Sequence, residues 1–497
     1  MSSNQQQWNS RFGLLMSTIG AAIGLGNLWR FPYMAFKSGG GAFFVPYIIA
    51  VLITGIPLLI MEFAFGFSIG SSAVRAFEKI SPKFAFIGHW STSICAIVFT
   101  FYTVIISWSL CYIFFSLNLM WGSDTNEFFF QKFLNISNGP MQFGRPNLML
   151  VGATFVTIAL NYFFARNSIQ KGLEKFCKIT TPLLAILVII IATKGVLSEG
   201  SDIGLRFLFK SDFSKIKDYK VWFSAFSQVF FSTTLGVGVM ISYASYLKNN
   251  KKLVENALIT AFSNCAFDIL AGVAVFSILG NASFHLGKTI PELVTSGPGI
   301  AFVAFPLAIN SMPIAPFFQA LFGFLFFSSL FIAGISSSLS MMEVYLLTTQ
   351  EHKKYKTSRS SEALKFCLIS FAVSLLFTTP AGLFLIDIVD HYINNFGIIL
   401  IGLTETIVIG YFHGSQKIIN VANKGNRLKI GLTWKIFTFY LTPLILTILI
   451  LENIYSEITE SYSGYPLVSL LIFGLPVALF NFLYALYLGR RRGDESR

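Results

Sequence analysis

The sequence predicts an all-α polytopic membrane protein, and three observations support that fold class. Charged residues make up 12% of the 497 residues and hydrophobic residues 54%, whereas a water-soluble chain usually carries about a quarter charged residues. Long apolar runs recur along the chain, and a run of roughly 20 residues crosses a bilayer as one helix. These runs are apolar on both faces, which disfavours the short alternating strands of a transmembrane barrel. A soluble enzyme and a disordered scaffold are therefore excluded.

The length rule predicts about 12 transmembrane helices. The predicted spans are 12–36, 42–69, 88–122, 146–165, 177–197, 221–247, 253–282, 313–349, 361–386, 387–412, 434–455 and 464–489. Between the seventh and eighth spans, the stretch 296–306 is apolar but bounded by proline and glycine and too short to span. It predicts a re-entrant or surface helical hairpin.

The net charge of +13 is distributed as a topology signal. Lysine and arginine concentrate in every second loop, with one exception in the loop that holds Arg206 and Lys220. By the positive-inside rule, the N-terminal segment 1–11 and the basic tail 490–497 are both cytoplasmic, as in a multi-pass protein of the cell (inner) membrane. No cleavable signal is expected before the first span. Nucleic acid is not an expected partner, because the chain has no reader motif.

Two of the predicted spans carry glycine clusters in their middle. The clusters are Gly20-Ala-Ala-Ile-Gly-Leu-Gly-Asn27 and Ser232-Thr-Thr-Leu-Gly-Val-Gly238. A glycine inside a helix costs about 1 kcal/mol relative to alanine, and unpaired backbone at membrane depth is tolerated only around a cavity or ligand. Each cluster comes first in a block of five spans, 12–198 and 221–412, which indicates a transporter built from an inverted repeat. Close helix packing through small residues explains either cluster alone equally well.

Seven motifs then resemble the neurotransmitter:sodium symporter family, in the order in which that family carries them. They are Trp8-Asn-Ser-Arg11, Gly24-Leu-Gly-Asn-Leu-Trp-Arg-Phe-Pro32, Gly39-Gly-Gly-Ala-Phe-Phe-Val-Pro46, Lys171-Gly-Leu-Glu-Lys-Phe176, Tyr243-Ala-Ser-Tyr246, Ala301-Phe-Val-Ala-Phe-Pro306 and Gly402-Leu-Thr-Glu405. The chain is most similar to bacterial amino-acid transporters with a leucine-transporter-like fold. The resemblance implies a 5+5 inverted repeat with broken first and sixth helices, followed by two further helices at 434–489 that are candidates for a homodimer contact.

The resemblance implies two sodium sites, built from the oxygen ligands that a hard cation prefers. The first uses the Ala22 carbonyl, Asn27, Ser232, Asn264 and the substrate carboxylate. The second uses the carbonyls of Gly20, Ile23 and Ala333 with the hydroxyls of Ser336 and Ser337. From the residues alone, the hydroxyl-rich run 333–338 is equally compatible with small-residue helix packing.

The same resemblance implies a substrate site between the two breaks, where helix N-termini suit a carboxylate. Its residues are Ala22, Gly24, Gly26, Val98, Tyr102, Phe231, Thr234, Val237, Ser337 and Met341. Tyr102 is similar to the family tyrosine that bonds the carboxylate. Monoamine-transporting members have an aspartate where this chain has Gly24, so the resemblance implies an L-amino acid, and the apolar side chains favour a hydrophobic or aromatic one.

Asp268 is the intramembrane carboxylate with the most specific predicted role. Any carboxylate at membrane depth is costly and is therefore a candidate functional residue. Asp268 falls four residues after Asn264, on the same helical face. Chloride-dependent relatives have a serine here, so the resemblance implies that Asp268 supplies the negative charge and that chloride is not required. A helix-end or water-facing aspartate is the alternative. Glu62 resembles the carboxylate that bonds the freed backbone of the sixth span.

The resemblance also implies two gates. Arg30 and Asp390 match an outer pair above the Phe231 lid, although a snorkelling arginine is the alternative for Arg30. Trp8 and Glu351 match the inner gate. Gln5 stands where the family usually has the inner-gate arginine.

These features predict a sodium-coupled symporter that imports a hydrophobic or aromatic L-amino acid by alternating access. The alternative is a substrate-binding, non-transporting regulatory or receptor-like relative, which only the Gln5 departure supports. An enzyme is not expected, because the histidines and cysteines lack ligand spacing and no nucleotide loop is present.

Overall fold

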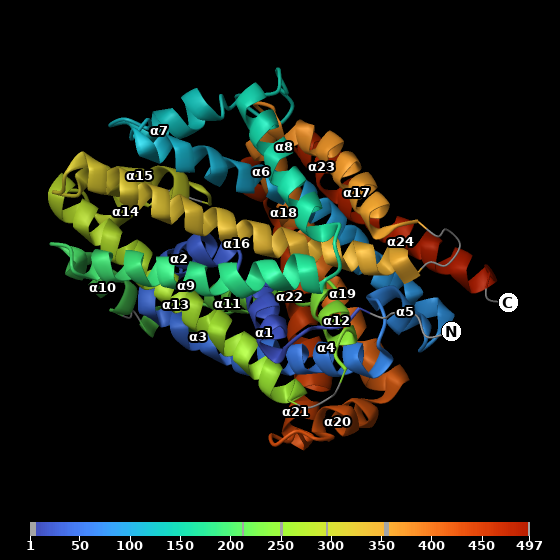
Figure 1. The fold of residues 1–497 in the computed structure, drawn as a ribbon. Helices are drawn as coiled ribbons and strands as arrows, with labels where there is room; N and C mark the ends of the chain where they lie inside the picture. The colour runs from blue at the N-terminus through green and yellow to red at the C-terminus, as the bar shows by residue number, and fades with distance from the viewer. Residues whose placement is uncertain (1–5, 211–212, 249–251, 295–296, 352–356, 496–497) are drawn as a thin grey trace.

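The computed structural model describes residues 6–210, 213–248, 252–294, 297–351 and 357–495, and the regular secondary structure in them is entirely helical (Figure 1). In chain order the α-helices are α1 (Arg11–Ala22), α2 (Leu25–Lys37), α3 (Phe44–Ala50), α4 (Ile56–Ile69), α5 (Ala73–Glu78), α6 (Ala85–Leu117), α7 (Thr125–Glu127), α8 (Leu148–Ala165), α9 (Lys175–Val196), α10 (Ser201–Phe209), α11 (Tyr219–Ser232), α12 (Val239–Ser245), α13 (Leu253–Leu286), α14 (Ile290–Leu293), α15 (Phe305–Ser311), α16 (Pro316–Glu351), α17 (Arg359–Ser374), α18 (Gly382–Tyr392), α19 (Ile399–Ile407), α20 (Ser415–Asn423), α21 (Leu432–Ile436), α22 (Thr442–Thr459), α23 (Leu467–Phe473) and α24 (Leu475–Glu495). Short 3₁₀ and π turns join several of them into longer rods.

The predicted polytopic membrane fold is confirmed. Within the described residues, ten continuous helical stretches are long and apolar enough to cross a bilayer: Gly40–Ile69, Pro82–Leu117, Leu148–Ala165, Gln170–Val196, Leu253–Leu286, Pro316–Glu351, Arg359–Thr378, Gly382–Asn423, Leu432–Gly464 and Leu467–Arg491. The α1–α2 pair makes an eleventh, bent span. The predicted sixth span consists of α11 and α12, which are too short to cross singly.

Both glycine clusters are helix breaks. The α1 and α2 axes meet at 48° across Ile23 and Gly24. Between α11 and α12, Thr234, Gly236 and Gly238 have φ of 52°, 74° and 75°. This left-handed backbone cannot continue a right-handed helix, and glycine adopts it without a steric penalty. Packing of small residues along unbroken helices, the alternative for these clusters, is therefore excluded.

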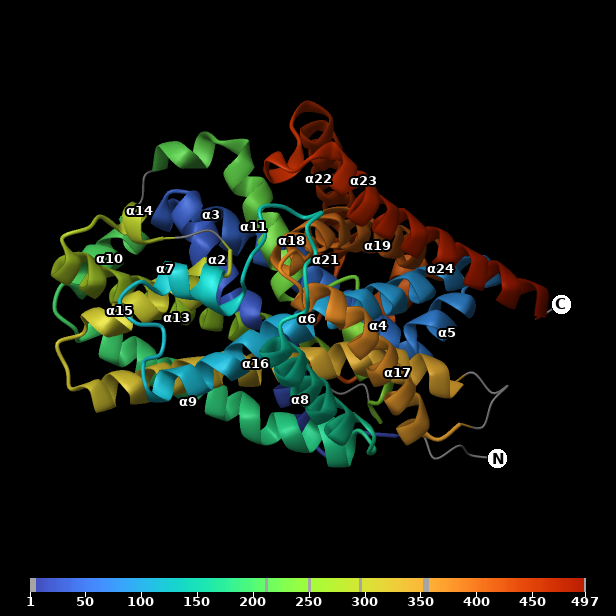
Figure 2. The same cartoon turned by 90° about the horizontal axis from the view of Figure 1, so that it is seen from above.

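Long, unbroken helices surround the two breaks. α6 and α16 lie side by side through the centre of the molecule in both views (Figures 1 and 2). α13 packs against both α1 and α2, and α4 packs against α12. The breaks thus lie between long helices that pack against them.

The structure differs from the prediction at the boundary between the ninth and tenth spans and in the form of the stretch 296–306. The ninth span ends at Thr378 and the tenth begins at Gly382, so the predicted boundary at 386/387 is wrong. Pro380 lies in the gap, and a proline cannot donate to a helix and disfavours helical geometry in the residue before it. In the stretch 296–306, the π turn Ile300–Ala304 and the first residues of α15 form one short, buried apolar helix. Ser296 itself lies outside the described residues.

The last two spans lie at the edge of the molecule (Figure 2). Their outer faces carry large exposed apolar side chains, such as Leu451 at 60% and Phe480 at 70% exposure. In a membrane protein such a face contacts lipid or another helix.

Candidate functional site

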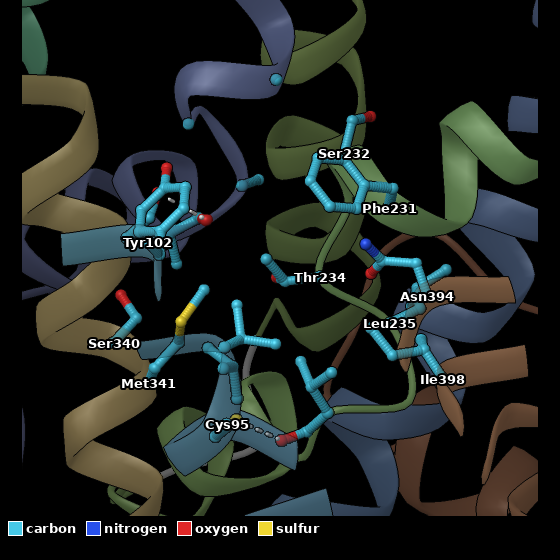
Figure 3. Close-up of a pocket in the computed structure, with 18 of the residues that line it drawn as sticks. Cys95, Tyr102, Phe231, Ser232, Thr234, Leu235, Ser340, Met341, Asn394 and Ile398 are labelled. Atoms are coloured by element: carbon cyan, nitrogen blue, oxygen red, sulfur yellow. Dashed lines mark hydrogen bonds between the residues drawn. The ribbon is translucent and has the colours of Figure 1, made fainter. Parts of the chain in front are cut away.

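A cavity lies between the two helix breaks. All ten residues implied for the substrate site line it: Ala22, Gly24, Gly26, Val98, Tyr102, Phe231, Thr234, Val237, Ser337 and Met341. Figure 3 shows Tyr102 and Met341 on one side of the cavity, facing Phe231 and Thr234 on the other. The structure therefore brings together residues that are more than 300 positions apart in the chain.

The first break presents the N-terminal end of α2 to this cavity. The Leu25 N–H donates to the Tyr102 hydroxyl at 3.1 Å, and the Gly24 N–H donates to Asn27 Oδ1 at 2.8 Å. A Cβ at Gly24 would lie 2.9 Å from the Tyr102 hydroxyl and 3.0 Å from Ser337 Oγ. Position 24 therefore has no room for a side chain. The N-terminal end of α2 is the positive end of the helix dipole, which suits a small anionic group.

The freed backbone of the sixth span is paired with side chains from two other helices. Glu62 Oε1 accepts from the Gly236 N–H at 2.9 Å, in agreement with the role implied for it. Ser91 donates to the Gly236 carbonyl at 3.2 Å, and Cys95 Sγ donates to the Val237 carbonyl at 3.3 Å. Ser91 and Cys95 do not appear among the predicted site residues. Their spacing from Tyr102 on one face of α6 is the signal that could have found them.

The side chains implied for the first sodium site form one buried cluster. Asn27 Nδ2 donates to Asn264 Oδ1 at 2.9 Å, and Asn264 Nδ2 donates to Ser232 Oγ at 2.8 Å. All three residues are buried, and Ala22, Asn27 and Ser232 line the cavity. The side-chain oxygens of Asn27, Ser232 and Asn264 are neutral. Together with a carboxylate from the substrate they can coordinate a hard cation.

Asp268 lies directly behind this cluster. Its Oδ1 accepts from Asn27 Nδ2 at 2.8 Å, and its Oδ2 accepts a hydrogen bond from the Tyr47 hydroxyl. The carboxylate is fully buried, which argues against the alternative of a helix-end or water-facing aspartate. Among the described residues it forms no ion pair, so no cationic side chain competes for this carboxyl with a cation held by its neighbours.

The residues implied for the second sodium site also converge. The Ser337 hydroxyl lies 3.5, 3.4 and 3.4 Å from the carbonyl oxygens of Gly20, Ala21 and Ile23. Ser336 Oγ donates to the Ala333 carbonyl at 2.9 Å, and its Cβ lies 3.4 Å from the Cβ position of Gly20. One hydroxyl proton cannot satisfy three carbonyls, so this gathering of oxygens can hold a cation.

Comparison with known proteins agrees with this geometry. The profile of the sodium:neurotransmitter symporter family matches residues 5–126 and 120–488. The chain belongs to this family. An uncharacterised sodium-dependent transporter of Methanocaldococcus jannaschii is 36% identical over 98% of both chains. The sodium-dependent dopamine transporter of Caenorhabditis elegans is 30% identical over 97% of this chain and 86% of its own. The human sodium- and chloride-dependent GABA transporter 2 is 29% identical over 82% and 73%.

Membership confirms the class of function. The protein is a sodium-dependent transporter of the neurotransmitter type that lies in a lipid bilayer and carries a small molecule, and it is not an enzyme.

At one side of the cavity, Arg30 covers Phe231. The guanidinium carbon lies 4.3 Å from the Phe231 ring centroid, and Nη2 donates to Ser227 at 3.3 Å. Asp390 lines the cavity and accepts from Asn394 Nδ2 at 2.7 Å. Arg30 and Asp390, both in the described part of the chain, form no ion pair within 4.0 Å in this conformation. The half-buried position of Arg30 over an aromatic ring argues against a snorkelling role.

Trp8, which precedes α1, packs against α12. Its indole N–H donates to the Tyr243 carbonyl at 2.8 Å, and its ring meets the Tyr243 ring edge-on at 5.2 Å. Glu351 instead accepts from the Ser72 N–H at 3.0 Å, at the N-terminus of α5. Gln5, the position that departs from the family pattern, lies outside the described residues.

A second acidic residue of α16 forms a buried ion pair that sequence reasoning missed. The Arg359 guanidinium binds both carboxylate oxygens of Glu343, and the Tyr246 hydroxyl donates to Glu343 Oε1 at 2.7 Å. Arg359 Nε also donates to the Ala165 carbonyl at 2.8 Å. This cluster ties α12, α16, α17 and α8 together. The signal available was a charged residue, Glu343, within an otherwise uncharged apolar run.

Proposed function

We propose that this symporter imports a hydrophobic or aromatic L-amino acid together with sodium by alternating access. The observation that carries the proposal is the N-terminal end of α2, which faces an apolar cavity beside the Tyr102 hydroxyl. Backbone N–H groups and a hydroxyl bind a carboxylate. Val98, Val237 and Met341 then leave an apolar surface for the ligand's side chain.

Gly24 supports an amino acid over a monoamine. A monoamine carries only a positive charge, so its site needs an acidic side chain close to the amine. The contacts of Gly24 with Tyr102 and Ser337 leave no space for one at this position. Dopamine, named for one of the relatives, is therefore less suitable than a ligand that brings its own carboxylate. GABA, named for another, has a carboxylate but no apolar side chain to fill the rest of the cavity.

We also propose two sodium ions. The first binds Ala22, Asn27, Ser232 and Asn264 and is completed by the substrate's carboxylate, which couples sodium binding to substrate binding. The second binds the carbonyls of Gly20, Ile23 and Ala333 and the hydroxyls of Ser336 and Ser337. Because it joins α1 to α16, it favours one arrangement of the broken first span. Asp268 supplies the fixed negative charge, so transport requires no chloride.

The transport cycle follows from the paired breaks. Blocks 12–198 and 221–412 are proposed to be inverted repeats that rock about the cavity. Arg30, Asp390 and Phe231 close its outer side, and Trp8 and Glu351 close its inner side. Both termini are proposed to be cytoplasmic, in an inner membrane. The exposed apolar faces of spans 434–489 suit a homodimer contact, which cross-linking in the membrane tests.

The experiment is radiolabelled amino-acid uptake into proteoliposomes with competition by all twenty amino acids. It is run with and without sodium, and with chloride replaced by gluconate. We expect uptake that needs sodium, ignores chloride and is blocked by apolar L-amino acids. Saturable binding without uptake favours the non-transporting alternative and makes Gln5→Arg the next variant to test.

A further inference from the structure

A basic groove lies on the outside of the inner gate, away from the cavity. It is lined by Asn9, Gln170, Lys171, Lys175 and Lys178. Lys178 forms an ion pair of 2.6 Å with the buried Glu174. Lys171 and Lys175 are exposed, and neither has an ion-pair partner within 4.0 Å in the described part of the chain. The groove thus carries two uncompensated positive charges at one helix end.

An apolar stripe on α9 begins at these lysines. Ile179, Leu183, Ile186 and Ile190 continue the face of Lys175 at helical spacing, with exposures of 63%, 40%, 54% and 45%. In a membrane-spanning helix, side chains exposed in this way contact acyl chains. A ligand that follows both features has an anionic head and long apolar tails.

We propose that Lys171, Lys175 and Lys178 bind the headgroup of an anionic phospholipid whose acyl chains lie along this stripe. A free phosphate ion would use the lysines and leave the stripe without a role. The continuity of the basic groove with the stripe therefore favours the lipid as the source of the anion.

The groove also holds the N-terminal segment of the inner gate. The Ile169 N–H donates to Gln6 Oε1 at 2.8 Å, and Gln170 Nε2 donates to the Gln7 carbonyl at 2.5 Å. Glu174 Oε2 accepts from the Asn9 N–H at 2.9 Å. A headgroup bound to this turn stabilises the docked position of residues 6–10, next to Trp8. Anionic lipid is thus expected to favour the conformation in which the inner side is closed.

The test is titration of the purified full-length chain with phosphatidylglycerol, followed by native mass spectrometry. The variant is Lys171→Gln with Lys175→Gln, which leaves the Lys178–Glu174 pair intact. The matched control is Lys417→Gln with Lys424→Gln, two exposed lysines in a loop that the charge pattern places on the same side of the membrane. Phosphatidylcholine and soluble glycerol phosphate are the comparison ligands.

We expect the variant to bind phosphatidylglycerol about 25-fold more weakly, because each lysine near an anionic lipid contributes about fivefold. The control variant and Lys171→Arg with Lys175→Arg should bind as the unchanged chain does. Equal binding by the Gln variant would mean that these lysines act only as topology signals and would overturn the proposal. Equal binding of phosphatidylcholine, or full competition by glycerol phosphate, would overturn it as well. The Gln variant could be less stable than the unchanged chain without lipid. In that case the Arg variant decides: retained binding of phosphatidylglycerol supports the proposal, and lost binding overturns it.

Discussion

At the scale of single residues, the site depends on one position without a side chain, Gly24, and on one buried carboxyl among neutral groups, Asp268. Gly24 has no side chain, so the N-terminus of α2 stays open. Tyr102 and Ser337 occupy the volume that a side chain at this position would fill. Asp268 brings one fixed charge to the back of a cluster made of neutral amides and hydroxyls. A cation in that cluster is favoured by the nearby carboxylate, since the low dielectric of the interior strengthens their attraction.

Replacement of Asp268 by serine should make transport dependent on chloride. The serine removes the fixed charge and leaves a polar space beside Asn27 and Tyr47 that an anion can occupy. We expect uptake in gluconate to fall on the order of tenfold or more, because a buried charge without its partner costs several kcal/mol, and chloride should restore it. Uptake is measured in proteoliposomes, with Asp202→Ser, an exposed site, as the control. Chloride-independent uptake by Asp268→Ser would refute the assignment.

Replacement of Gly24 by alanine should weaken substrate binding. The new Cβ would approach the Tyr102 hydroxyl to 2.9 Å, and such overpacking typically costs about 1–3 kcal/mol. We expect the apparent affinity to fall about tenfold in a binding assay. Gly152→Ala is the matched control, because its Cβ would meet no atom within 4 Å. That variant should keep its affinity and gain up to about 1 kcal/mol of stability. Unchanged affinity in Gly24→Ala would place the ligand elsewhere.

At the scale of elements, the two breaks solve the same problem with different partners. Each exposes backbone that the bilayer cannot hydrate. In the first span, Asn27 and Tyr102 accept from the freed N–H groups of Gly24 and Leu25. In the sixth span, Glu62 accepts from the Gly236 N–H, and Ser91 and Cys95 donate to the carbonyls of Gly236 and Val237. Helices α4 and α6 therefore stabilise an unwound segment that its own sequence leaves unpaired.

Replacement of Glu62 by leucine should destabilise the sixth span. The Gly236 N–H would lose its buried acceptor, which costs about 1–3 kcal/mol. We expect a lower midpoint of thermal unfolding in detergent and reduced uptake. Glu62→Gln keeps an acceptor oxygen in place and should stay close to the unchanged protein. Equal loss in both variants would show that the negative charge, and not the hydrogen bond, matters at this position.

At the scale of the whole molecule, the candidate sodium sites connect helices that belong to different blocks of five spans. The second site lies where the carbonyls of α1 meet Ser337 of α16. On the other side of α1, Cys177 of α9 is fully buried, and its Sγ lies 3.6 Å from the Cβ position of Gly20. A cation that fixes α1 against α16 should therefore also keep α1 packed over Cys177.

Sodium should protect Cys177 from modification. The background is a chain in which Cys111, Cys265 and Cys367 are replaced by alanine and Cys95 by serine, which keeps a donor for the Val237 carbonyl, so that Cys177 is the sole reporter. We expect a water-soluble maleimide to label it several-fold more slowly in sodium than in N-methylglucamine, since the ligand shifts the population toward the state it binds. The Ser337→Ala variant should lose this protection. Labelling that is independent of sodium would contradict the role of the second site.

The sequence by itself determined the membrane class, the approximate number of spans and the two breaks, and its family motifs predicted residues that the structure gathers around one cavity. Hydropathy, glycine clusters and family motifs are properties of neighbouring positions, so they can be read without a fold. Only the tertiary structure decided how the site is held together. It brought Ser91 and Cys95 to the sixth break beside Glu62, placed Asp268 behind Asn27, and paired Arg359 with Glu343. These contacts join helices that are far apart in the chain. Their partners are ordinary polar residues, and the role of each depends on which helix packs against it. Local pattern shows that a backbone group must be satisfied, whereas packing alone selects the side chain that satisfies it.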